Sequence, residues 1–242
     1  MLIIRICAAA IALALCALPA SAGDFAERHI FGFSPDGGHF AFEEYGVQDG
    51  SGFPYSDIYM IDVTDDSWLP GTPLRVRIDD ESATLEEARL QSHQQAAGRL
   101  EKFRIGRQPV HVASNPYTQL NADFNFVLVN PRLVAPPIDR PYAFRLSAYP
   151  LPGAADYCAD FGETKGFQLE LIYGADDTSV ILQRDERLPQ SRACPLDYQI
   201  ADIYTFYPES GAPVFAALIR MIGVGFEGPD GRYLAVTGKL PN

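Results

Sequence analysis

The clearest local structure signal in the chain is Phe31-Gly32-Phe33-Ser34-Pro35-Asp36-Gly37-Gly38-His39-Phe40-Ala41-Phe42. Its centre, Ser34-Pro35-Asp36-Gly37, is turn chemistry, because proline presets φ at the first corner, aspartate caps the turn, and glycine accepts a positive φ. The stretch therefore predicts a turn with a strand on either side. A polar glycine-rich loop follows, and then the strand-like run Ser56-Asp57-Ile58-Tyr59-Met60-Ile61-Asp62-Val63.

Beyond this stretch, apolar residues mostly recur with a period of two, and turn residues separate the short apolar runs. This pattern predicts antiparallel strands. The candidate strands are 39–45, 57–63, 74–78, 110–113, 124–129, 142–149, 167–173, 179–184, 198–206, 214–221 and 232–237.

One segment departs from the strand pattern. After Asp80 the composition turns to Glu, Gln, Ala and Leu, and Thr84-Leu85-Glu86-Glu87 has the form of a capping box. We predict a helix over 85–102, whose thin apolar stripe suits a position across a sheet face or edge. The whole pattern predicts a mainly β, antiparallel two-sheet sandwich with this one helix, and a small or degenerate β-propeller is the alternative.

The first 22 residues have the form of a cleavable secretory signal. One basic residue, Arg5, precedes an apolar run, and Ala20-Ser21-Ala22 stands before Gly23. A lipoprotein anchored through Cys16 is the alternative, although Leu15 stands where a small residue is required. We expect cleavage after Ala22, a periplasmic location, and a single secreted β domain over 23–242. No later apolar run approaches the roughly 20 residues that a transmembrane helix needs.

The chain is acidic, with 31 Asp and Glu against 19 Lys and Arg and a formal net charge of −12. Removal of the signal takes away Arg5 and no acidic residue. Such a surface repels phosphates, which argues against nucleic acid and anionic membranes as partners. We expect a monomer that binds an unknown envelope protein or a small ligand.

Two of the four cysteines, Cys7 and Cys16, leave with the signal. Cys158 and Cys194 then remain as the only pair in an oxidising compartment. We therefore predict a disulfide between Cys158 and Cys194, which stabilises the fold by roughly 3–4 kcal/mol in the chain-entropy view.

The opening motif has an echo near the end of the chain, Gly225-Phe226-Glu227-Gly228-Pro229-Asp230-Gly231-Arg232-Tyr233-Leu234-Ala235-Val236. A β structure whose two chain ends lie side by side could give this repetition. The alternative is that Pro-Asp-Gly between aromatic residues is simply a common hairpin.

Two resemblances rest on these motifs. The stretch from Phe33 to Asp62 resembles one blade of the WD-like propeller repeats of periplasmic proteins. The chain after the signal more closely resembles a bacterial family of predicted secreted proteins of unknown function, the domain-of-unknown-function 2259 type. Its shared features are Phe42-Glu43-Glu44-Tyr45-Gly46, the loop 49–57, the run 183–189 and the turn 225–230. The family resemblance implies export and a single domain, and it brings no known catalytic residues.

Standard catalytic signatures are absent from the sequence. The four histidines do not have zinc-site spacing, Gly50-Ser51-Gly52 is not a nucleophile elbow, and no phosphate-binding loop occurs. We therefore predict no cofactor and no metal site, and catalytic residues stay unknown.

The first candidate for function is the pair Glu43 and Glu44. In a strand, Phe40, Phe42 and Glu44 share one face, so Glu44 faces the core if the phenylalanines do. A buried carboxylate must be paired or have a raised pKa. We predict a structural ion pair of Glu44 with Arg220, and a ligand-binding or catalytic role is the alternative.

The second candidate is the loop 46–56. Asp49 and Ser51 supply polar groups, Phe53 and Tyr55 supply aromatic surface, and Asp57 follows directly. Binding loops have this mixture, and so do long hairpins whose aromatic residues fold back on the sheet.

These features favour an exported, soluble binding or interaction module in which no catalytic machinery is recognisable. One alternative is a hydrolase of an envelope glycan or polymer, which would use Glu43 or Glu44 with Asp49 or Asp57 at about 5–10 Å. The other is a purely structural envelope protein, which predicts no deep pocket. A lined concavity beside Glu44 and Phe53 would favour a binding site over a scaffold.

Overall fold

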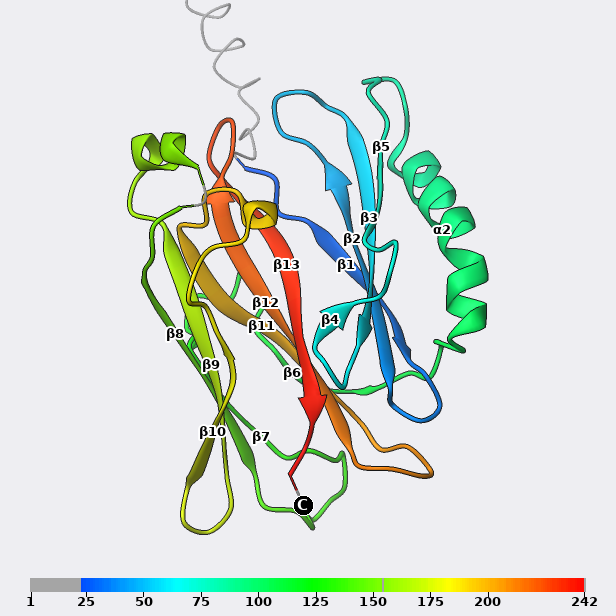
Figure 1. The fold of residues 1–242 in the computed structure, drawn as a ribbon, viewed down its shortest axis with the longest axis vertical. Helices are drawn as coiled ribbons and strands as arrows, with labels where there is room; N and C mark the ends of the chain where they lie inside the picture. Colours follow the sequence, from blue (N-terminus) through cyan, green and yellow to red (C-terminus); the bar gives the residue numbers. More distant parts are fainter. Residues whose placement is uncertain (1–22, 154, 242) are drawn as a thin grey trace, which may run out of the picture.

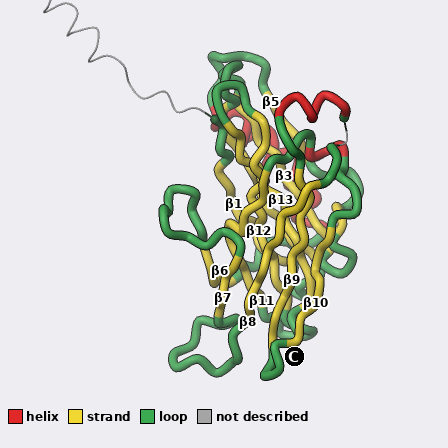
Figure 2. The backbone as a smooth tube through the Cα atoms, turned by 90° about the vertical axis from the view of Figure 1, so that its left-hand side faces the viewer, coloured by secondary structure: helices red, strands yellow, loops and turns green. Residues whose placement is uncertain are grey.

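The computed structural model describes residues 23–153 and 155–241, so the expected signal lies outside the described residues. These residues form three antiparallel sheets stacked in layers, with one long helix on the outside (Figure 1). Figure 2 shows the strands running along the length of the molecule, with most loops at their ends.

The first sheet has five strands. Its order is β1 (Glu27–Phe33), β2 (His39–Val47), β3 (Pro54–Asp62) and β4 (Ser67–Trp68), with β5 (Leu74–Arg77) also pairing with β3.

The other two sheets have four strands each. The middle sheet has the order β13 (Pro229–Lys239), β12 (Val214–Val224), β11 (Asp197–Phe206) and β6 (Val110–Ser114). The third sheet has the order β10 (Thr178–Arg184), β9 (Lys165–Tyr173), β8 (Tyr142–Pro150) and β7 (Phe126–Val129). Two short 3₁₀ helices, η1 (Asp156–Phe161) and η2 (Gln190–Arg192), lie between strands of these sheets in the sequence.

The middle sheet is covered on both faces, which explains the unbroken apolar run at the start of β12. Alternate residues face opposite cores: Leu218 packs in the core shared with the first sheet, and Ile219 packs in the core shared with the third. A strand buried on both faces is apolar at nearly every position. This double burial makes the molecule a stack of three sheets where two were predicted.

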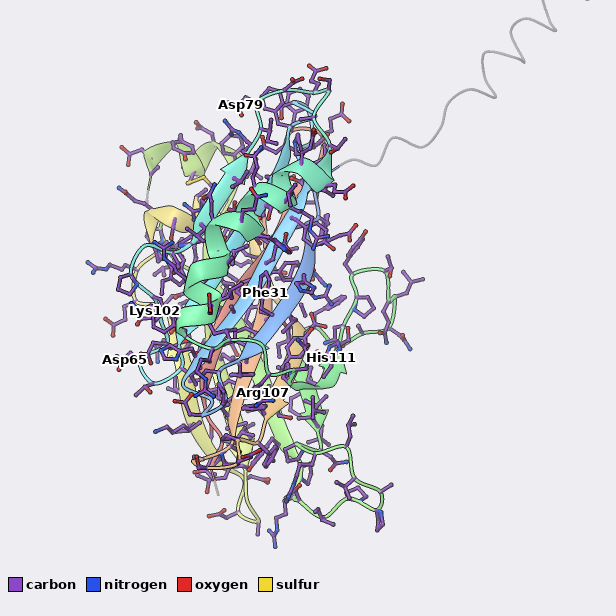
Figure 3. All side chains as sticks on the ribbon, turned by 90° about the vertical axis from the view of Figure 1, so that its right-hand side faces the viewer. Phe31, Asp65, Asp79, Lys102, Arg107 and His111 are labelled. Carbon is purple, nitrogen blue, oxygen red and sulfur yellow. A yellow bond between two sulfur atoms is a disulfide. The ribbon has the colours of Figure 1, made fainter. Side chains whose placement is uncertain are left out.

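Helix α2 (Leu85–Lys102) has the bounds that the sequence predicts. The capping box is present, with the Glu87 N–H donating to the Thr84 side chain and the Thr84 N–H donating to the Glu87 carboxylate. The buried residues of α2 are small, namely Ala88, Ser92 and Ala96. They let the helix lie close across the outer face of the first sheet, near Phe31 (Figure 3).

The predicted mainly β, sandwich-like architecture is confirmed, and a strand occupies each predicted strand position. Strand β1 is the strand predicted before the turn at Ser34–Gly37, although its bounds were not predicted, and β4 was not among the candidates. The resemblance to a WD-like propeller blade is wrong, because β1 to β4 form one layer of the stack and none of the three described sheets closes on itself.

Two further expectations concern distant parts of the chain. Cys158 and Cys194 form the predicted disulfide, with their Cα atoms 5.3 Å apart. The segment before β1 also lies beside the start of β13. Phe25 forms a parallel bridge with Gly231, and the Ala26 N–H donates to the Gly231 carbonyl at 3.0 Å.

Candidate functional site

A groove of about 540 Å³ opens between the first and third sheets, and β13 residues line its floor. Figure 1 shows β13, the edge strand of the middle sheet, between strands of the other two sheets. We call this groove the edge groove. The wall from the first sheet and its loops consists of Phe42, Glu44, Asp57, Tyr59, Asp66, Trp68 and Arg75. The opposite wall includes Phe167, Gln183, Pro189, Ser191 and Arg192, and the floor consists of Met221 and the β13 residues 232–236.

Glu44 lies at one end of this groove and is 3% exposed. One carboxylate oxygen accepts from the Tyr59 hydroxyl and the other accepts from the Tyr233 backbone N–H, both at 2.7 Å. Burial raises the pKa of Glu44 to about 7, although both hydrogen bonds favour the charged form. The carboxyl group therefore gains or loses its proton near neutral pH.

Asp57 stands directly opposite Glu44 in the β2–β3 register. Directly opposite residues of an antiparallel pair hold their Cβ atoms about 4.5–5.5 Å apart. Burial raises the pKa of Asp57 to about 6, and Arg75, whose Nε lies 3.4 Å from an Asp57 oxygen, partly offsets this effect. Two carboxyl groups with raised pKa values thus lie together at this end.

The other end of the groove combines a carboxylate with an aromatic surface. Asp66 accepts hydrogen bonds from the backbone N–H and the hydroxyl of Thr237, at 2.7 and 2.8 Å. Trp68 is 47% exposed and its ring lies 5.9 Å from that of Tyr59. An exposed tryptophan at a groove mouth offers a flat apolar face to a ligand.

Three arginines reach the groove, and two of them are committed to partners. Arg232 donates to the carboxylate of Asp24 at 2.5 Å, and Arg192 donates to the carboxylate of Asp185 at 2.5 Å. The Arg75 side chain is 52% exposed, and its one ion pair with the residues that the structure describes is the longer contact with Asp57. Arg75 is therefore the cation most available to a ligand.

Glu43 lies on the opposite face of β2, beneath α2. It accepts hydrogen bonds from Arg89 Nε and Nη2 and lies near His93 Nε2, each at 2.9 Å, and it accepts from the Ser56 hydroxyl at 2.8 Å. Burial tends to raise the pKa of Glu43, but the contacts with Arg89, His93 and Ser56 outweigh it and hold the pKa below its usual range. Glu43 therefore anchors the helix and lies away from the groove.

The predicted ion pair between Glu44 and Arg220 is wrong, because the two side chains have different partners. Arg220 is 1% exposed, and its guanidinium donates to Gln199 Oε1 at 2.9 Å and to the Asn115 carbonyl at 3.0 Å. Its guanidinium carbon lies 5.7 Å from the centre of the Tyr117 ring. Neutral acceptors and aromatic rings thus surround this buried cation where a carboxylate was expected.

The loop 46–56 lies outside the edge groove. Asp49 accepts from the Glu227 N–H at 2.9 Å, and the Ser51 hydroxyl accepts from the Phe53 N–H at 3.3 Å. Tyr55 is buried, with its hydroxyl donating to Asp24 at 3.0 Å. The loop is thus a hairpin that contacts the turn between β12 and β13. Of the predicted candidates, the structure brings only Glu44 and Asp57 into the groove.

Several groove residues were missed by sequence reasoning. They are Asp66, Trp68, Arg75, Gln183, Ser191, Arg192 and Arg232 to Val236. They come from several separate elements, so no local pattern links them. The one available signal was Trp68, which is the single tryptophan of the chain.

Two features are absent from the described residues. No group of three or more His, Cys, Asp and Glu side chains there is arranged to hold a metal ion. Within the same residues, no helix has the length and apolar character needed to cross a membrane.

In a comparison with known protein families, residues 41–239 match a family described as predicted secreted protein (DUF2259). The chain belongs to this family. The matched span contains every residue that lines the edge groove. The family description confirms the expectation of export, and it assigns no ligand or reaction. Comparison with curated proteins finds no match.

Proposed function

We propose that this member of the family is an exported binding module whose ligand occupies the edge groove. The observation that carries the proposal is the groove itself, a concavity of about 540 Å³ with converging polar groups and an exposed tryptophan at its mouth. Ligand pockets typically enclose about 300–1,000 Å³ and combine apolar walls with a few placed polar groups.

The groups in the groove support binding more than catalysis. Both Glu44 oxygens accept hydrogen bonds from the protein, and Asp57 lies against Arg75. The exposed faces of Trp68 and Arg75 are free to contact a ligand. A purely structural envelope protein would have little use for such a groove.

A hydrolase is the second candidate, because Glu44 and Asp57 are adjacent carboxyl groups with raised pKa values in one groove. Glycosidases use two carboxyl groups in this way. The test is release of reducing ends from soluble envelope glycans by the wild type and by Glu44→Gln and Asp57→Asn. Loss of a measurable rate in both variants would establish this reading in place of binding alone.

The proposal includes export to the periplasm as a single β domain, with cleavage after Ala22. The family description supports export, and Asp24, two residues beyond the proposed cleavage site, is bound to Arg232 of β13. Mass spectrometry of the exported protein should find Gly23 at its N-terminus.

The binding proposal can be tested with intrinsic fluorescence, because Trp68 is the single tryptophan and stands in the groove. The probes are chitooligosaccharides, free amino acids and a pool of random hexapeptides. We expect one class to change the Trp68 emission with saturation, and Arg75→Ala to weaken that binding at least threefold. Gln95→Ala, on the exposed face of α2, is the matched control. A ligand that binds without changing the Trp68 emission, and with the same affinity for the wild type and Arg75→Ala, would show that the binding site lies outside the edge groove.

A further inference from the structure

The hydrogen bonds along the outer edge of β13 follow a period of two. The N–H groups of Gly231, Tyr233 and Thr237 donate to Asp24 O, Glu44 and Asp66. All three acceptors lie outside the middle sheet. In an antiparallel pair, alternate residues direct their N–H and C=O groups away from the partner strand. These three residues therefore belong to the outward-facing series of β13.

Ala235 belongs to the same series and stands between two capped positions. It is two residues from Tyr233 and two from Thr237, and the β12–β13 register runs unbroken through the pair Leu218 and Ala235. Ala235 lines the edge groove, and its backbone N–H and C=O have no hydrogen-bond partner among the described residues. An edge-strand donor and acceptor thus face the groove.

We propose that the edge groove takes an extended polypeptide segment, which adds to β13 as a further strand and exchanges hydrogen bonds with the backbone of Ala235. This inference rests on the proposed function, since it names the class of ligand for the same groove. Strand addition to an exposed edge is an established mode of peptide recognition, in which main-chain hydrogen bonds give affinity and side-chain sites give specificity.

The spacing of the two caps limits the length of the segment. Tyr233, capped by Glu44, and Thr237, capped by Asp66, are four residues apart, which is about 13 Å along a strand. The open edge therefore has room for about three to five residues of ligand. A short extended segment fits this length better than a folded domain surface.

The residues that line the two walls indicate which side chains the bound segment carries. Successive residues of an added strand point to opposite walls. One set would contact Trp68 and Tyr59, and the other would contact Gln183 and Ser191. We expect apolar or aromatic residues to alternate with polar ones.

The test begins with a random hexapeptide library displayed on phage and selected on the full exported protein. Selected peptides are resynthesised and titrated by Trp68 fluorescence. Each peptide is then made with a single backbone N-methyl group at successive positions. We expect N-methylation to weaken binding at least tenfold at the one position whose N–H donates to the Ala235 carbonyl, and to leave the two neighbouring positions within about threefold.

A change in Ala235 tests the protein side of the same hydrogen bonds. Ala235→Pro removes the outward N–H without removing a bond of the β12–β13 ladder, a position where edge strands tolerate proline. We expect peptide affinity to fall at least tenfold, while Ala235→Ser, which keeps the N–H, stays within about threefold of the wild type. If the proline variant does not fold, amide exchange in the wild type replaces it, and saturating peptide should slow exchange at Ala235 at least tenfold.

The outcomes separate the two proposals. A chitooligosaccharide that binds in the groove while no peptide does would overturn strand addition and leave the binding module standing. Peptides that bind with no position sensitive to N-methylation, and without protection of the Ala235 amide, would do the same. Peptides whose binding leaves the Trp68 emission unchanged, and whose affinity is the same for the wild type and Arg75→Ala, would overturn both proposals.

Discussion

The buried carboxylate of Glu44 accepts a 2.7 Å hydrogen bond from the backbone N–H of Tyr233, 189 residues further along the chain. A side chain of the first sheet thereby caps the edge strand of the middle sheet. Because burial raises the pKa of Glu44 to about 7, the charge at this junction changes near neutral pH. Stability and groove chemistry are therefore both coupled to pH.

The free energy of unfolding should fall as the pH rises from 5 to 8. The folded pKa of Glu44 is about 7 against 4.5 for the free group, and that of Asp57 is about 6 against 3.8. In this range the folded state holds protons that the unfolded state has released, so a higher pH favours unfolding.

Glu44→Gln should remove most of this slope. Its amide oxygen can accept from Tyr233 while its amide N–H donates to the Tyr59 oxygen. At pH 8 we expect the variant to be more stable than the wild type by roughly 2–3 kcal/mol, as measured by urea titration. Glu209→Gln, on the surface, is the control. A slope identical to that of the wild type would show that Glu44 is charged in the folded state throughout the range.

On the acid side, Asp202 should have the opposite effect. Burial tends to raise its pKa, but the contacts with His111 and Arg28 outweigh it and hold the pKa below its usual range. This stabilisation is present above the unfolded pKa of about 4 and is lost as the pH falls through the lower folded value. Asp202→Asn should cost about 2 kcal/mol at pH 6, and the cost should shrink as the pH falls below 4. A cost that stays constant across this pH range would contradict the assignment.

Glu43 should stabilise the packing of α2 against the first sheet. Glu43→Gln removes the charge that Arg89 contacts with two nitrogens, and we expect a cost of about 1–3 kcal/mol. Amide exchange in α2 should accelerate more than exchange in β12. Gln95→Ala, on the exposed face of the same helix, should change neither. Uniform acceleration across both elements would mean that the anchor stabilises the whole molecule and not the helix in particular.

The disulfide should contribute to the free energy of unfolding without affecting the structure of the edge groove. Its residues are 36 apart, so the chain-entropy view gives about 4 kcal/mol for closing the loop. The double variant Cys158→Ala and Cys194→Ala should unfold at a lower urea concentration, while Trp68 emission of the folded protein stays unchanged. A shift in that emission would show that the disulfide shapes the groove.

The helix bounds, most strand positions and the disulfide pairing could be predicted, because each depends on local or compositional signals. The capping box at Thr84 and the alternation of Phe40, Phe42 and Glu44 are such signals. The number of sheets could not be predicted in this way. The apolar run of β12 arises because both of its faces are buried, and the sheets that bury them become known only from the structure.

By itself the sequence determined that Glu44 faces the core, because the period of two places it on the face of Phe40 and Phe42. Only the tertiary structure decided its partner. The third sheet and the first sheet stand on either side of β13, so its free edge becomes a groove floor and its backbone amides become the partners of Glu44 and Asp66. Backbone groups are the same at every residue, so no pattern of side chains can reveal which of them remain unpaired.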